Sequence, residues 1–128
     1  MLPHCREQGI AFLPFAPLGR GFLTGRFASS QDLPREDFRR GLPRFQQDAL
    51  RANRAIVEQA RQVARRAGAT PAQVALAWVL AQGRHVVPIP GTKTPRHLAD
   101  NAGAADIELS AADLAELDAL PAPQGARY

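Results

Sequence analysis

Two short apolar runs predict two strands in a chain whose other segments have helical spacing. Residues 10–16 read IAFLPFA and residues 86–89 read VVPI, and continuous apolar runs of this length are typical of strands buried on both faces. Because roughly seventy residues with helical patterns separate the runs, we expect parallel strands joined by a right-handed crossover. Pro14 has no backbone N–H, so we expect its missing donor to face the strand's end or an unpaired edge.

The longest helical pattern covers residues 46–67 and predicts one amphipathic helix that ends at Gly68. Its apolar stripe consists of Ile56, Ala60, Val63 and Ala67. A second helix follows Thr70, which forms a predicted capping box with Gln73. Residues 74–81 are apolar on nearly all sides, so we expect this helix to be largely buried, with Trp78 in the core.

Shorter helices are predicted nearer the ends of the chain. Residues 2–8 read as the last turns of a helix stopped by Gly9, and residues 95–103 carry Leu98 and Ala102 at helical spacing. A last helix follows the capping residue Ser110, with Asp113 at its third position. We expect residues 121–128 to form a loose tail.

Residues 17–44 form a predicted loop rich in Gly, Pro and Arg, without a sustained period. Compact domains seldom contain loops of this length unless the loops are functional or mobile. Glycines at positions 19, 21 and 25 allow positive φ angles and a close approach of the backbone to a ligand. A glycine-rich surface turn has the same composition, so these residues alone leave both interpretations open.

Positive charge gathers where one predicted helix begins. Thr94 suits the N-cap and Pro95 the first helical position, and Lys93, Arg96 and His97 lie at this terminus, where the helix dipole is already positive. A phosphate would offset the charge, because backbone N–H groups and cationic side chains would point at one anion. Solvated side chains in an arginine-rich protein explain the same pattern, so charge alone does not decide.

Composition limits the classes of protein without selecting one. The chain has 128 residues, of which 45% are hydrophobic and 22% charged, and this is typical of one modest soluble domain. The single Cys5, the lack of a membrane-length apolar stretch and the lack of a signal-peptide core favour the cytoplasm. The net charge of +4 suits phosphate-bearing ligands, and no residues have metal-ligand spacing.

Two stretches, LPFAPLGRGFLTGRF at 13–27 and VVPIPGTKTPRHLADNAGA at 86–104, resemble the C-terminal part of the aldo-keto reductases. The resemblance runs from about residue 2 to residue 120. It implies an α/β fold: a partial TIM barrel comprising the last two βα units of the family's (β/α)8 barrel and a C-terminal helix. Residues 1–128 would then be a single partial domain, and its cofactor would be NADP(H).

The resemblance also implies a set of cofactor-binding residues. They are Phe15, Leu18, Gly19, Gly21, Gly91, Thr92, Lys93, His97, Asp100 and Asn101. Lys93 and His97 would meet the 2′-phosphate of NADP, and Asp100 and Asn101 would reach the adenine. Taken without the resemblance, Asp100 is equally a solvated helical carboxylate and Asn101 a side chain bonded to its local backbone.

The remaining candidates belong to the two loops that follow the strands. Gly91 and Thr92 would add backbone and hydroxyl contacts, and the loop with Leu18, Gly19 and Gly21 would contact the pyrophosphate. Phe15 would stack on the nicotinamide.

Three positions depart from the family pattern. Phe15 replaces a frequent Tyr, Ala16 a usual Ser, and His97 a frequent Arg. Phe15 has an alternative role as a core aromatic at a strand end. An imidazole is mostly neutral at pH 7, which makes NADP preference less secure than NADP binding.

The resemblance implies that the catalytic Tyr, Lys, Asp and His lie on earlier strands, so no catalytic residue is predicted in this chain. Its only Tyr is Tyr128 and its only Lys is Lys93. We therefore expect the NADP(H)-binding part of an enzyme family that moves hydride between NADPH and aldehydes or ketones. One alternative is a non-catalytic half-barrel that pairs with itself or with a complementary half through exposed strand edges. A basic nucleic-acid-binding domain is the other, and the lack of aromatics interleaved with Arg argues against it.

Overall fold

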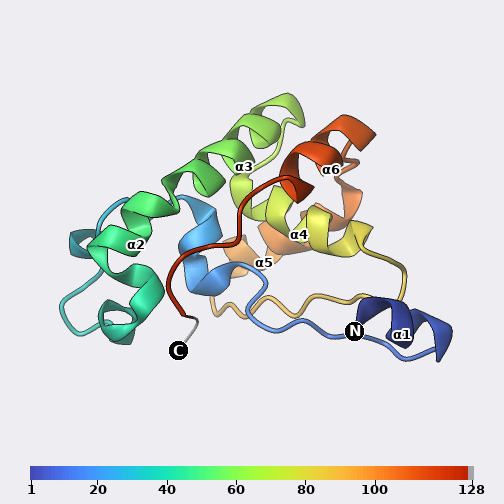
Figure 1. The fold of residues 1–128 in the computed structure, drawn as a ribbon, viewed down its shortest axis with the longest axis horizontal. Coiled ribbons are helices and arrows are strands. Elements are labelled where there is room, and N and C mark those ends of the chain that lie inside the picture. Colours follow the sequence, from blue (N-terminus) through green and yellow to red (C-terminus); the bar gives the residue numbers. More distant parts are fainter. Residues whose placement is uncertain (127–128) are drawn as a thin grey trace.

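The computed structural model describes residues 1–126 and consists of helices above two extended segments (Figure 1). The α-helices are α1 (Leu2–Glu7), α2 (Gln47–Ala52), α3 (Arg54–Arg66), α4 (Pro71–Ala81), α5 (Pro95–Ala102) and α6 (Ala111–Asp118). The 3₁₀ helices are η1 (Gly19–Thr24), η2 (Ser30–Asp32), η3 (Phe38–Gly41), η4 (Pro43–Phe45) and η5 (Gly103–Asp106). No described helix is long and apolar enough to cross a membrane.

The two apolar runs pair in parallel, as the sequence predicts. Phe12 forms a parallel bridge with Val86, and Phe15 forms one with Ile89. The backbone N–H of Phe12 donates to His85 O at 2.7 Å. In the described residues these bridges stay isolated and do not merge into a continuous strand.

Pro14 explains the interruption and corrects one expectation. Its carbonyl accepts from Ile89 N–H at 3.2 Å, and Val87 N–H donates to Phe12 O at 2.9 Å. In a parallel ladder the N–H and C=O of such a residue face the same neighbour, so the Pro14 nitrogen faces the Val87 carbonyl. The missing donor therefore lies inside the pair, whereas we expected it to face the strand's end or an unpaired edge.

The strands are covered on one face only, although continuous apolar runs are typical of strands buried on both faces. Val86 is 3% exposed, because the helices pack on its face of the pair. Leu13, Phe15, Val87 and Ile89 alternate with the covered residues and are 54, 49, 49 and 48% exposed. We call these four residues the open strand face, since no other described element covers them.

Asn53 divides the predicted helix 46–67 into α2 and α3. Its φ and ψ are −84° and 0°, and its side chain is only 1% exposed. The Asn53 Nδ2 donates to Gln124 O at 2.8 Å, and Gln124 N–H donates to Asn53 Oδ1 at 2.7 Å. A buried amide that bonds another segment in both directions holds the helix break in place.

The same two hydrogen bonds correct the expectation of a loose tail over 121–128. Arg44 Nη2 adds a bond to Gly125 O at 3.1 Å, so the described part of the tail is tied to α2 and η4. Residues 127–128, including Tyr128, lie outside the described residues.

The predicted helix starts are confirmed at α4 and α6, and side-chain burial differs in two places. Thr70 with Gln73, and Ser110 with Asp113, form complete capping boxes. Trp78 is half-buried instead of lying in the core, and its Nε1 donates to Asp118 Oδ1 at 2.7 Å. Leu98, which was expected on the apolar side of α5, is 62% exposed.

The long loop supplies part of the core. Phe22 and Leu33 of the loop, together with Phe45 at the end of η4, pack with Leu50 of α2 and Val57 of α3. A second cluster forms where Val63 and Ala64 of α3 meet Val74 of α4. Because its aromatic and aliphatic side chains are buried, the loop folds as 3₁₀ turns against the helices, and its other face is free to line a site.

Candidate functional site

A cavity of about 840 Å³ opens where the two strands end, and we call it the loop cavity. Its walls come from residues 16–39, from the start of α4 and from residues 89–101. Ala16 and Ile89, the last residues of the two strands, both line it. The cavity therefore lies at the carboxyl ends of parallel strands, the edge where α/β folds place ligands.

Seven of the ten predicted cofactor residues line this one cavity. They are Leu18, Gly21, Gly91, Thr92, His97, Asp100 and Asn101. They come from two stretches about seventy residues apart, so the structure brings together what the sequence could only assign separately.

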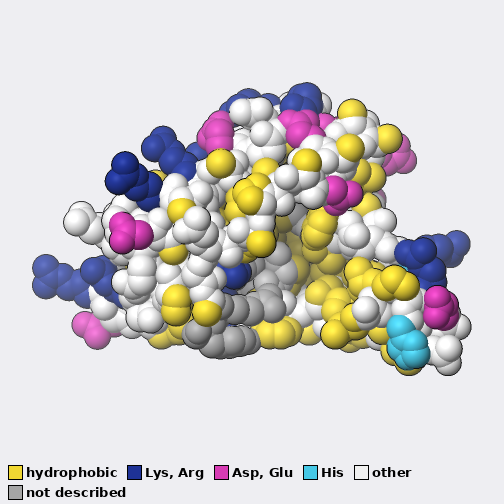
Figure 2. Space-filling view, in the orientation of Figure 1, with side chains coloured by type: hydrophobic (Ala, Val, Ile, Leu, Met, Phe, Trp, Pro, Cys, Tyr) yellow, Lys and Arg dark blue, Asp and Glu magenta, His cyan; other side chains and the backbone are white. Residues whose placement is uncertain are grey.

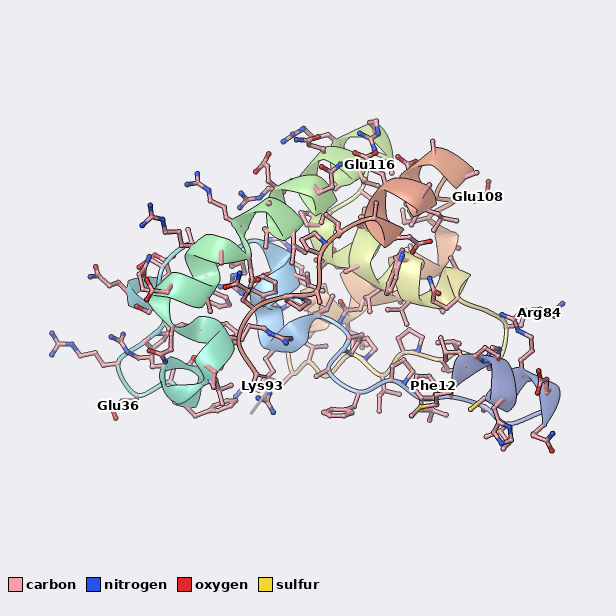
Figure 3. All side chains as sticks on the ribbon, viewed as in Figure 1. Phe12, Glu36, Arg84, Lys93, Glu108 and Glu116 are labelled. Atoms are coloured by element: carbon pink, nitrogen blue, oxygen red, sulfur yellow. The ribbon has the colours of Figure 1, made fainter. Side chains whose placement is uncertain are left out.

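Three predicted residues do not line the loop cavity. Phe15 is on the open strand face, and Gly19 lines a different cavity. Lys93 is exposed, and Figure 3 shows its side chain below the C-terminal segment. Thr94 precedes α5 as predicted but makes no side-chain cap bond.

Sequence reasoning missed three arginines that line the cavity: Arg20, Arg26 and Arg39. Their positions in the glycine-rich loop were the available signal. Single arginines carried little weight because the whole chain is rich in arginine. With two lining carboxylates, Asp32 and Asp100, the walls hold more positive than negative side chains.

Arg39 is fixed by contacts on three sides. Its Nη2 and Nε donate to the Asp37 carboxylate at 2.6 and 2.9 Å, and its Nη1 donates to Arg20 O at 2.8 Å. The guanidinium also lies over the Phe27 ring, 4.6 Å from the centroid. Hydrogen bonds from Arg39 lower the pKa of Asp37 from 3.8 to about 2, so this ion pair persists at neutral pH.

Position 21 requires glycine, because a side chain there would have no room. Its φ is +95°, and a Cβ there would lie 3.0 Å from the Phe27 ring and 3.2 Å from Arg39 Nη1. Gly19 and Gly25 also have positive φ, at +57° and +73°. The turn of η1 thus depends on glycine where the loop faces the cavity.

The start of α4 forms another part of the wall, through Thr70, Pro71 and Ala72. The Thr70 hydroxyl accepts from Gln73 N–H at 3.2 Å. The positive end of the α4 dipole adds to the arginines, and this electrostatic environment suits an anion.

The fold and the site define an α/β unit with a cationic cavity at the carboxyl ends of two parallel strands. A sequence model described as the aldo/keto reductase family matches residues 1–122. The chain belongs to the aldo/keto reductase family.

Individual relatives agree with this assignment. The chain is 45% identical over 117 residues to aldo-keto reductase yakc [NADP(+)] of Schizosaccharomyces pombe, which covers 91% of this chain and 34% of the relative. It is 44% identical over 131 residues to probable aldo-keto reductase 1 of Glycine max, covering 100% and 38% of the two chains. The chain therefore spans about a third of these relatives' length.

A solved structure supports the fold. The crystal structure of a thermostable aldo-keto reductase in complex with the inhibitor epalrestat matches with a TM-score of 0.63 at 26% identity. The match covers 91% of this chain and 32% of that chain. The neighbour is a TIM barrel, which agrees with the parallel pairing seen here.

Proposed function

We propose that this chain is the NADP(H)-binding C-terminal portion of an aldo/keto reductase, built from the last two βα units of the barrel. The observation that carries the proposal is the loop cavity, which collects seven predicted cofactor residues from two distant stretches. One relative is itself named as an NADP(+) enzyme.

The side chains of the loop cavity fit a phosphate-bearing dinucleotide. Arg26 makes no ion pair within the described residues, so its guanidinium is available to an anion. Arg39 is bound by Asp37 and instead fixes the loop that would face the pyrophosphate. On the other wall, His97 and Asn101 offer hydrogen bonds of the kind that an adenine and its ribose phosphate accept.

When bound, NADPH would supply the hydride for reduction of an aldehyde or ketone. This chain's residues would bind and orient that cofactor, with Phe15 offering a ring face for stacking at the strand end. We assign no catalytic residue here, and the proton donor would come from the preceding part of a complete barrel.

The open strand face supports a second part of the proposed function, which is assembly with another chain. Leu13, Phe15, Val87 and Ile89 form a continuous apolar set on paired strands, and a barrel leaves no such face uncovered. We propose that self-association or a complementary barrel half covers this face. Such an assembly would also complete the surroundings of the loop cavity.

Replacing Lys93, which follows Thr92 of the loop cavity but does not itself line it, tests the predicted contact with the 2′-phosphate. We expect Lys93→Ala to weaken NADPH binding by about five- to ten-fold and to leave NADH binding unchanged, because only NADPH carries the 2′-phosphate that the ammonium would contact. Titration of the protein followed by cofactor fluorescence measures both affinities.

Arg84→Ala provides the matched control. Arg84 is an exposed cation at the end of the molecule that carries α1, away from Lys93 (Figure 3). We expect this variant to bind both cofactors as the unaltered chain does. Equal loss of NADPH and NADH affinity in Lys93→Ala would contradict a role at the 2′-phosphate.

A further inference from the structure

A second cavity of about 400 Å³ lies away from the loop cavity, between α3, α4 and α6, and we call it the apolar cavity. Its walls include Ile56, Ala60, Val74, Ala75, Trp78 and Leu117. Figure 2 shows hydrophobic side chains gathered in a hollow between the C-terminal segment and α4. None of its lining residues is needed for the cofactor contacts proposed above except Gly19, which η1 presents to this side.

The C-terminal segment closes one side of the apolar cavity. Residues 120–123 line it, and the segment is held by the paired hydrogen bonds of Asn53 with Gln124. Arg44 Nη2 binds Gly125 O at 3.1 Å immediately beyond. The cavity wall is therefore a tied part of the fold.

Charged groups at the cavity are already engaged. Asp118 accepts from Trp78 Nε1 at 2.7 Å, and the Arg44 guanidinium is bonded to the Gly125 carbonyl. The rest of the wall is apolar, so a charged group buried against it would lose its hydration without gaining a partner, and such burial is strongly unfavourable. An uncharged apolar molecule loses little hydration free energy, and it gains apolar contacts with the walls.

We propose that the apolar cavity binds a neutral, hydrophobic small molecule of about the size of a bicyclic ring system. An apolar cavity of about 150 Å³ holds benzene, so a cavity more than twice as large accommodates a second fused ring. This site is distinct from the proposed NADP(H) site, although η1 contributes to the walls of both.

Trp78 provides the test, because it is the only tryptophan and it lines the cavity. Its indole N–H gives a single resolved resonance in a ¹H–¹⁵N spectrum of the full chain. We expect 2-naphthol to shift this resonance saturably at neutral pH, and naphthalene-2-sulfonate to bind at least about ten-fold more weakly because its charge would be buried. Saturating NADPH should not displace 2-naphthol.

Two variants in which alanine is replaced by phenylalanine show where 2-naphthol binds. Ala75→Phe fills the cavity from α4 and should weaken 2-naphthol affinity by about ten-fold or more. Ala55→Phe adds the same ring to the exposed side of α3, outside the cavity, and should leave the affinity unchanged. If Ala75→Phe does not fold, Ala60→Leu narrows the same cavity from α3.

Unchanged affinity in the cavity-filling variant would overturn the proposal, because the ligand would then bind elsewhere. The absence of a saturable shift in the unaltered chain would overturn it as well. Equal binding of the sulfonate would refute the requirement for a neutral ligand. A loss of NADPH binding with intact 2-naphthol binding would contradict only the cofactor proposal.

Discussion

One guanidinium, that of Arg39, joins the loop cavity to the core beneath it. The side chain binds Asp37, reaches the Arg20 carbonyl and lies over Phe27, a ring that packs against the buried Phe45. The ion pair with Asp37 and the contact with the Phe27 ring thus hold the glycine-rich loop against the core. An altered Arg39 would change the shape of the loop before it changed any direct ligand contact.

Because of the Asp37 carboxylate, the stability of this arrangement depends on pH. Its pKa in the folded protein is about 2, below the usual 3.8, so ionised Asp37 stabilises the fold above pH 3.8 and this stabilisation is lost as the pH falls through about 2. We expect the free energy of unfolding to fall across this window more steeply in the unaltered protein than in Asp37→Asn. Urea unfolding at a series of pH values measures the difference, and parallel curves would contradict it.

At the scale of single residues, the family motifs assign ten residues to a cofactor, and seven of the ten line the loop cavity. Gly21, Gly91, Asp100 and Asn101 are among the seven, whereas Gly19 lines the other cavity. Arg39 lies outside the motif stretches, and Arg26 lies within 13–27 but was given no role, because composition made both indistinguishable from other arginines. Only the folded loop shows which arginines face the cavity.

At the scale of elements, the break between α2 and α3 is the main departure from periodicity. No Pro or Gly interrupts the sequence near Asn53, so the pattern predicts one helix over residues 46–67. The partner that holds the break, Gln124, lies 71 residues away. Local spacing cannot contain that information, whereas the capping boxes of α4 and α6 were predictable because every partner is three residues away.

The Asn53 side chain should contribute measurably to stability. We expect Asn53→Ala to lower the free energy of unfolding by about 1–3 kcal/mol, because it removes two hydrogen bonds and leaves Gln124 backbone groups without them. Urea unfolding monitored by the fluorescence of Trp78 measures the change.

Asn53→Asp is the matched control, since it keeps the oxygen that accepts from Gln124 N–H and loses the amide that donates to Gln124 O. We expect this variant to differ in stability from both the alanine variant and the unaltered chain. Identical unfolding curves for Asn53→Ala and the unaltered chain would show that the tail bonds do not stabilise the fold.

At the scale of the whole molecule, the main feature is the open strand face, on which four apolar side chains are exposed. The sequence predicted parallel strands because a long stretch with helical patterns separates the two runs, and a continuous apolar run is typical of a strand buried on both faces. The second face stays open because the described chain supplies helices to one side only. A continuous apolar run therefore indicates that both faces of a strand are buried, but it does not show which chain covers the second face.

Assembly through this face is directly testable. We expect the chain to self-associate at micromolar concentration and Leu13→Lys to shift it toward the monomer, because a charge would be placed in the apolar contact. Light scattering or sedimentation measures the state. Leu98→Lys is the control, since Leu98 is 62% exposed but belongs to α5 and not to the open strand face. A stable, well-folded monomer of the unaltered chain would contradict the proposal.

The bond between Asn53 and Gln124 also sets a time order for biosynthesis. A ribosome makes Asn53 first and then adds 71 residues before Gln124 exists. At ordinary rates of synthesis that interval is roughly 4 to 14 s. During it, the amide that belongs in the core can bond only water or a substitute partner, so the junction of α2 and α3 is completed after translation has passed the last helix.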